Sequence, residues 1–150
     1  MIREAKPGDE YAIIDLIKEL AVYEKEPLSS VKNTPAQLAK DLFNDRICSA
    51  YVVQINDKVV GYAIYYFSYS TWNGVCLYLE DLYVQPEHRD KRIGSTLFDA
   101  VVSKAKEMKV RRMDWQIIHW NEPALDFYRH KGATIDGDWL NGRLFFNDTE

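Results

Sequence analysis

Residues 78–97 read YLEDLYVQPEHRDKRIGSTL and carry three local signals in a row. The apolar residues up to Val84 predict a strand, Pro86 ends it, and a helical period begins near Ile93. Cations stand just before that helix, at Arg89, Lys91 and Arg92. They oppose the helix dipole, whereas a bound anion would be stabilised by them and by the free backbone N–H groups. The stretch therefore predicts a strand–turn–helix unit that binds phosphate, with a solvated charged loop as the alternative.

Two adjacent carboxylates, Glu80 and Asp81, lie in the strand part of this stretch. Neighbouring residues of a regular strand point to opposite faces, but a β-bulge would turn both toward one side. Two acids in the otherwise apolar run from Leu77 to Val84 favour a site for a cation over an ordinary surface ion pair. An acidic pocket beside a phosphate-binding turn is the resulting expectation.

The bulk composition excludes several classes of protein. The chain has 150 residues, of which 47% are hydrophobic, and we expect a single domain over residues 1–150. A net charge of −4 does not suggest the basic face of a nucleic-acid binder. No apolar run approaches the roughly 20 residues of a membrane span, and the histidines lack metal-ligand spacing. Cys48 and Cys76 form no CxxC pair and, without a secretory signal, are expected as reduced cytoplasmic thiols.

Hydrophobic periodicity predicts the remaining elements on both sides of the stretch. Strands are expected over 2–5, 49–55, 59–69, 75–84 and 112–118, and helices over 10–23, from Pro35, over 94–108 and over 122–130. Asp9 and Thr34 are candidate caps of the first two helices, and residues 133–147 are expected as one or two closing strands. Antiparallel strands come first and a β-α-β unit follows. The fold class is therefore α/β, with one mixed sheet and helices on its faces.

The turn lacks the phosphate-loop motif GxxxxGK[ST], and the chain has no GxGxxG motif. Residues 89–94, which read RDKRIG, instead resemble the [Q/R]-x-x-G-x-[G/A] motif of the GNAT N-acetyltransferases, which also follows a strand and opens a helix. Wider stretches are similar to the diamine acetyltransferases of the spermidine/spermine type and their thialysine-acetylating relatives: IKELA at 17–21, YE at 23–24, YYF at 65–67, YLED at 78–81, WNEP at 120–123 and FY at 127–128.

This resemblance implies the GNAT fold, a single mixed and mostly antiparallel β-sheet flanked by helices on both faces. It also implies acetyl-CoA as cosubstrate, held by loop amides at its pyrophosphate, with no metal. Arg92 replaces the first glycine of the motif. If that position requires a positive φ, an arginine there would be strained.

The resemblance further assigns roles to single residues. Glu80 would take the proton of the amine through a water, and Tyr128 would protonate the departing thiolate. CoA would lie against Leu82, Tyr83, Val84, Arg89, Asp90, Lys91, Arg92, Ile93, Gly94, Ser95 and Asn121. The amine would lie near Tyr23, Glu24, Trp72, Glu80, Asp81, Asp114, Trp115 and Gln116. From the residues alone, Tyr128 also fits a core tyrosine and Asn121 a helix cap.

The expected function is that of a cytoplasmic, homodimeric N-acetyltransferase. It would move an acetyl group from acetyl-CoA directly to a primary amine of a polyamine, a diamine or a thialysine- or lysine-like molecule. Ser70 stands where the spermidine/spermine enzymes carry an acid two residues before Trp72, which is closer to the thialysine type. A protein or peptide N-acetyltransferase and a non-catalytic acyl-CoA-binding regulatory protein stay open as alternatives.

Overall fold

A computed structural model describes residues 1–146, with the side chains of Asp90 and Lys91 outside that description. The chain divides into two compact units, which are treated separately below. The sheet unit comprises Met1–Gln116, and the C-terminal unit begins at Ile117.

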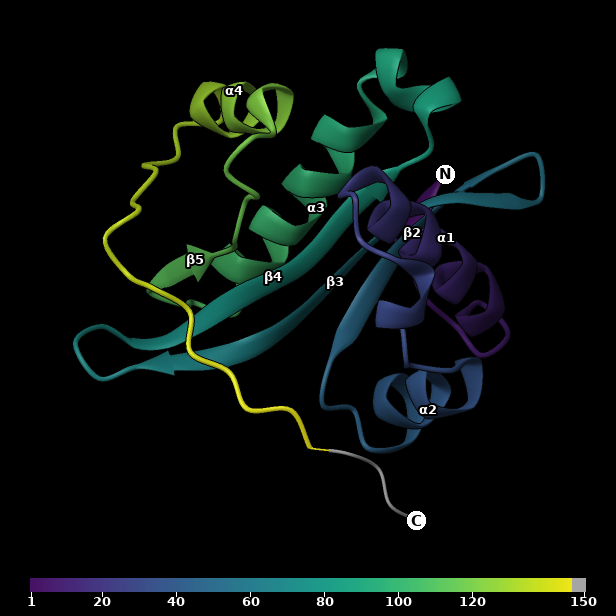
Figure 1. Ribbon diagram of the computed structural model, residues 1–150, viewed down its shortest axis with the longest axis horizontal. Coiled ribbons are helices and arrows are strands. Elements are labelled where there is room, and N and C mark those ends of the chain that lie inside the picture. The colour runs from purple at the N-terminus through teal and green to yellow at the C-terminus, as the bar shows by residue number, and fades with distance from the viewer. Residues whose placement is uncertain (147–150) are drawn as a thin grey trace. The chain divides into compact units, whose positions relative to one another are not determined.

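The sheet unit is built on a five-stranded sheet in the order β1-β2-β3-β4-β5 (Figure 1). The strands are β1 (Ile2–Glu4), β2 (Ser49–Ile55), β3 (Lys58–Ser70), β4 (Gly74–Val84) and β5 (Arg112–Asp114). The first four pair antiparallel in chain order, and β5 returns parallel to β4. The turn between β2 and β3 has positive φ at Asn56 and Asp57, as a tight hairpin of twisted strands requires. The predicted mixed, mostly antiparallel sheet is confirmed.

Helices cover the sheet on both faces. They are α1 (Glu10–Tyr23), α2 (Pro35–Ala39), which continues as a wider π-helical turn over Lys40–Asn44, and α3 (Ile93–Glu107). Apolar side chains of α1 and α2 pack with alternate residues of β2, β3 and β4, among them Ile13, Leu38, Val52, Tyr62 and Tyr83. Helix α3 packs on the same three strands. Because the neighbours Val52 and Val53 are both 0% exposed, neither face of β2 is left to solvent.

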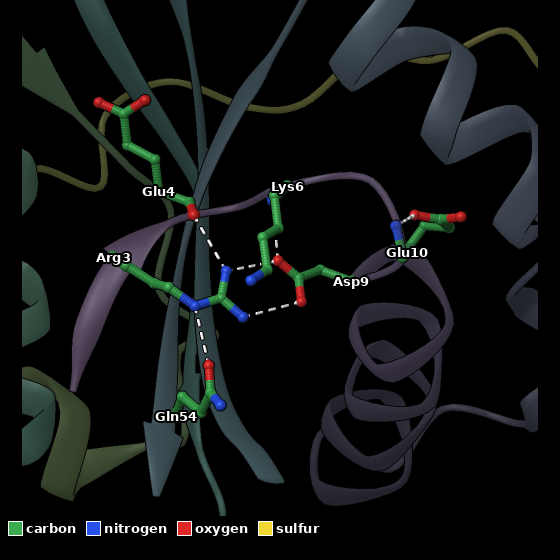
Figure 2. A network of polar contacts seen from close by, with 7 residues as sticks. Arg3, Glu4, Lys6, Asp9, Glu10 and Gln54 are labelled. Atoms are coloured by element: carbon green, nitrogen blue, oxygen red, sulfur yellow. Dashed lines mark hydrogen bonds and ion pairs between the residues drawn. The ribbon is translucent and has the colours of Figure 1, made fainter. Parts of the chain in front are cut away.

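The start of α1 is held by an ion pair instead of the predicted cap. The carboxylate of Asp9 makes no capping bond but accepts two hydrogen bonds from the Arg3 guanidinium, at 2.7 and 3.1 Å (Figure 2). It also accepts the N–H of Lys6 at 2.8 Å, while Arg3 Nε donates to Gln54 Oε1. Burial alone would raise the pKa of Asp9, but the hydrogen bonds and charges of Arg3 and Lys6 outweigh it and lower that pKa. The ion pair thereby joins β1 and β2 to α1.

The C-terminal unit contains one helix within residues 117–146, α4 (Glu122–His130). Asn121 caps it, since its Oδ1 accepts the N–H of Ala124 at 3.3 Å, and Gly132 follows at φ +89°. The closing strands predicted for 133–147 are wrong for residues 133–146, which form neither strand nor helix, and residue 147 lies outside the described residues. The described part of this unit has no strand with which the segment could pair, and the turn formers Gly137 and Gly142 interrupt its apolar residues.

Candidate active site

A β-bulge in β4 places the two adjacent carboxylates. Leu79 pairs with Tyr65 and Asp81 pairs with the next residue back, Ile64, so Glu80 is an extra residue without a partner in β3. The bulge puts Asp81 on the face of β4 that a regular strand would have given to Glu80. The Tyr62 hydroxyl donates to Asp81 Oδ2 at 2.9 Å on that face. The bulge proposed from the sequence is therefore present.

Glu24, at the C-terminal end of α1, joins Glu80 and Asp81 in what we call the acid trio. The pKa of each is raised, first by loss of water around the carboxylate. The negative charge of Asp81 raises the pKa of Glu24 and of Glu80 further. At Asp81 itself, the hydrogen bond from Tyr62 partly offsets the rise in pKa. Within the described residues, the ion pairs all involve other carboxylates. Repelling carboxylates without a basic partner form a site that a cation would stabilise.

Tyrosines surround the acid trio. The ring centroids of Tyr66 and Tyr78 lie 5.3 Å apart, and the negative charge of Glu80 contributes to raising the pKa of both phenols. Loss of hydration, followed by that charge, raises the pKa of Tyr78 to about 12. Tyr62 is 0% exposed, and burial followed by the charge of Asp81 raises its pKa well above the usual range. These phenols therefore stay protonated near neutral pH and can donate hydrogen bonds.

The main chain of β4 is open on its β5 side beyond the bulge. Strand β5 pairs only with Cys76, Leu77 and Tyr78, whereas β4 continues to Val84. In the described part of the sheet unit, residues 79–84 thus have a strand partner only in β3. Alternate backbone groups of a strand point to opposite sides, so those on the open side can accept or donate to a ligand. The predicted ligand-binding residues Leu82, Tyr83 and Val84 lie in this open segment.

The turn after β4 leads into helix α3. Residues Pro86–Lys91 form a 3-10 turn, and Arg92 then adopts φ +59° before α3 begins at Ile93. The position therefore does require a left-handed backbone, which glycine would adopt with less strain. Among the side chains that the structure describes, which leave out Asp90 and Lys91, none caps α3, and a Cβ added at Gly94 would meet nothing within 4 Å. The first N–H groups of the helix, including those of Gly94 and Ser95, thus suit a phosphate group.

The side chain of Arg89 is engaged within the protein. Its Nε donates to the carbonyl oxygen of Val84 at 2.8 Å. Its guanidinium carbon lies 5.4 Å from the ring centroids of both Tyr23 and Tyr83. The side chains of Asp90 and Lys91, predicted beside it, lie outside the described residues.

The other predicted substrate residues divide between the tip of the β3–β4 hairpin and β5, where Asp114 lies in register with Tyr78 of β4. Trp72 lies at the tip of the β3–β4 hairpin and is 88% exposed, about 20 Å along the strand from Glu80 at the usual rise per residue. Asp114 pairs with Arg112, whose Nε is 2.8 Å from its Oδ1. Trp115 packs edge-on against Phe98 of α3, with ring centroids 5.4 Å apart, and Gln116 is exposed.

The predicted residues Asn121 and Tyr128 belong to the C-terminal unit. Asn121 caps α4, as the sequence allowed, and Tyr128 is a buried residue of the same helix. Its ring meets that of Phe127 edge-on, with centroids 5.1 Å apart.

Sequence reasoning missed Tyr62, whose hydroxyl holds Asp81. The signal was available in principle, because a buried tyrosine requires a hydrogen-bond partner and Tyr62 lies in the strand next to two acids. Only the strand register, with its bulge, shows which acid it meets. Among the described residues, no cluster of His, Cys, Asp and Glu has the arrangement of a metal site, and the length and apolarity needed to cross a membrane are not found in any helix.

Known proteins resemble this chain in sequence and in fold. The model of the acetyltransferase (GNAT) family matches residues 13–133. The chain is 42% identical over 142 residues to the thialysine N-epsilon-acetyltransferase of Bos taurus, covering 89% of this chain and 83% of that protein. It is 34% identical over 140 residues to spermidine/spermine N(1)-acetyltransferase-like protein 1 of Homo sapiens, covering 88% of this chain and 20% of that protein. The crystal structure of an aminoglycoside acetyltransferase from an uncultured soil metagenomic sample, in complex with trehalose, has the same fold, with a TM-score of 0.78 at 20% identity over 98% of this chain and 96% of that one.

Proposed function

We propose that this chain, which belongs to the acetyltransferase (GNAT) family, moves an acetyl group from acetyl-CoA directly to a primary amine of a small molecule. The proposed acceptors are polyamines, diamines and thialysine- or lysine-like amines. The observation that carries the proposal is the acid trio, in which Glu24 joins the two carboxylates at the bulge of β4 and no ion pair with a described basic side chain is found. An alkylammonium substrate would supply the missing positive charge.

The reaction begins with loss of a proton from the bound ammonium, because an alkylammonium has a pKa near 10 and no free lone pair. Glu80 is the proposed base, acting through a water, and its raised pKa favours this role. Asp81 and Glu24 hold the cation, and Tyr62 keeps Asp81 in place. The neutral nitrogen then attacks the thioester carbonyl carbon without a covalent enzyme intermediate, and the second proton that it loses on becoming an amide would restore the proposed acid through water.

The second half of the reaction needs two further groups. Backbone N–H groups on the open side of β4, at Leu82–Val84, would stabilise the negative charge that develops on the carbonyl oxygen. The carbon–sulfur bond then breaks, and Tyr128 is the proposed donor of a proton to the CoA thiolate. This assignment for Tyr128 is derived from the family resemblance, whereas Glu80 is also supported by its surroundings.

Acetyl-CoA would be held mainly by main-chain groups. The proposed ligands of its pyrophosphate are the N–H groups of the turn and of the first turn of α3, from Arg89 to Ser95, with the Arg92 side chain adding positive charge. Asp90, Lys91 and Asn121 complete the proposed set. The start of α3, which no described side chain caps, and the open space in front of Gly94 support it.

We extend the proposal to the substrate side and to assembly. Tyr23, Trp72, Asp114, Trp115 and Gln116 are retained as proposed acceptor-side residues within a single domain over 1–150, in a cytoplasmic homodimer. Exposed apolar side chains offer surfaces for a second copy at Trp72, Trp139, Leu140, Leu144, Phe145 and Phe146. Sedimentation equilibrium would test the dimer, and a monomer at micromolar concentration would contradict it.

Release of free CoA thiol from acetyl-CoA tests the function directly. The purified chain is assayed with thialysine, lysine, spermidine, a short diamine and a panel of peptides bearing lysine or a free N-terminus. We expect turnover with the small amines and little with the peptides. Turnover confined to peptides would identify a protein acetyltransferase. CoA binding by calorimetry without turnover on any amine would identify a regulatory acyl-CoA-binding protein.

A further inference from the structure

Arg89 connects two parts of the sheet unit that the proposed reaction uses for different purposes. It lies in the turn that precedes α3, on the cofactor side, yet its guanidinium lies over the ring of Tyr23 at the end of α1. Tyr23 is followed directly by Glu24 of the acid trio. The same guanidinium lies over Tyr83, and the Tyr83 hydroxyl donates to Glu19 of α1 at 3.0 Å. Arg89 is thus placed between β4 and the end of α1.

The end of α1 contains a backbone position that disfavours a side chain. The helix closes with hydrogen bonds from the N–H of Glu24 to Leu20 O and from that of Glu26 to Ala21 O. This closure forces Lys25, which is not a glycine, to φ +65°. Glu24 therefore occupies the last position before a left-handed residue, where its direction depends on how the helix end is held.

The geometry of Arg89 also differs from that of a free phosphate ligand. Nε, one of its donors, is already used on the Val84 carbonyl, and both ring contacts lie within the roughly 6 Å range of cation–π interactions. A planar guanidinium suits this combination of one hydrogen bond and two rings, and an ammonium does not. Arg89 and the neighbouring Arg92 at the start of α3 are both exposed, so these contacts, and not burial, distinguish Arg89.

From these contacts we propose that Arg89 is a positioning residue for the amine. Its main chain borders the cofactor loop, while its side chain holds Tyr23, and thereby Glu24, at the acceptor side. The role rests on the proposed function, in which Glu24 helps to bind the ammonium group. The proposal gives the two arginines of the motif different roles, because Arg89 would position the amine and Arg92 would bind acetyl-CoA.

The test compares R89A and R89K with the matched variant R92A. Calorimetry gives the Kd of CoA, and initial rates at saturating acetyl-CoA give the KM of the amine. We expect R89A to raise the amine KM about fivefold and to change the CoA Kd by less than about twofold. R89K should share the defect because lysine keeps the charge but loses the planar group and Nε. R92A should show the reverse, with a weaker CoA Kd and an unchanged amine KM.

Two outcomes would overturn the role. One is a CoA Kd that rises in R89A as much as in R92A and is restored in R89K, which would identify a phosphate ligand. The other is an unchanged amine KM in R89A. If the wild-type chain turns over no amine, the proposed function fails, and hydrogen exchange still tests the contact. Residues 20–26 should exchange faster in R89A than in R92A without any ligand, and equal exchange would show that Arg89 does not hold this segment.

Discussion

Asp9 and the acid trio, all carboxylates of the sheet unit, have opposite electrostatic surroundings. Asp9 is 8% exposed and accepts hydrogen bonds from Arg3 and from the N–H of Lys6, so its pKa is lowered (Figure 2). The acid trio of Glu24, Glu80 and Asp81 has no basic partner among the described residues, and each pKa is raised. Asp9 has its counter-charge inside the chain, whereas in the proposed function the counter-charge of the acid trio is the bound ammonium group of the substrate.

The contrast separates a structural from a functional use of the same chemical group. A carboxylate with its cation in place stabilises the fold and gains nothing from a ligand. A carboxylate that repels its neighbours costs stability, and a bound cation would relieve that cost. Substitutions in the two groups should therefore affect different measurements.

The largest effect is expected for Glu80→Gln. The amide keeps the shape of the side chain but cannot accept the proton, so kcat/KM for the amine should fall by about 10² to 10⁴-fold. The melting temperature should stay the same or rise, because one repelling charge is removed. Steady-state kinetics and thermal unfolding check both parts, and turnover close to that of the wild-type chain would remove Glu80 from the mechanism.

Asp9→Asn should give the opposite pattern. The variant leaves the Arg3 guanidinium without its carboxylate, and the free energy of unfolding should drop by about 1–3 kcal/mol. Urea unfolding measures the drop. The KM values for acetyl-CoA and amine should not change, and a shift in either would show that this ion pair reaches the site.

Asp9 and the acid trio should affect the pH dependence of stability in opposite directions. Since the folded pKa of Asp9 is lowered, its contribution is complete above its unfolded pKa of about 3.9 and is lost as pH falls through the folded value. Since the pKa values of the acid trio are raised, the folded chain binds more protons than the unfolded chain just above pH ~4.3, and stability there falls as pH rises. Urea unfolding at several pH values should therefore lose the first dependence in D9N and weaken the second in E80Q. Identical profiles in all three chains would contradict the comparison.

The smallest of these effects is expected for Tyr62→Phe. Loss of the hydroxyl removes the hydrogen bond that favours ionised Asp81, so the pKa of Asp81 should rise further. The amine KM should increase about threefold near neutral pH, and more at lower pH. Tyr51→Phe is a suitable control, because Tyr51 lies on β2 and packs on Tyr65 away from the acid trio. Equal KM values in the two variants would argue against a role for Tyr62.

The sequence was informative wherever a local signal determined the structure. Residues 49–55, 10–23 and 122–130 form the predicted elements with the predicted bounds, because periodicity and flanking turn residues determine them. A bulge was considered as the way for two neighbouring acids to share one face, and a positive φ as one reason for the glycine of the motif, and the structure has both features.

Sequence analysis was less accurate for features that depend on contacts between residues far apart in the chain. The segment 133–146 has strand-forming residues, but a strand requires a neighbour to pair with, and sequence alone does not supply one. Arg89 was predicted beside phosphate because of its charge and place before a helix. Its contact with Tyr23 joins residues that are far apart in the sequence, so no local pattern could indicate it.

Because Glu80 is an inserted residue, the sheet does not need it. If a single codon were lost at this position, Leu79 and Asp81 would face Tyr65 and Ile64 in an uninterrupted ladder, with the rest of β4 in its present register. Such a deletion should preserve the far-ultraviolet circular dichroism and the melting temperature while abolishing acetyl transfer. A chain that fails to fold without Glu80 would refute this. A single-codon deletion in evolution could thus remove the proposed activity from a descendant of this protein and leave its fold unchanged.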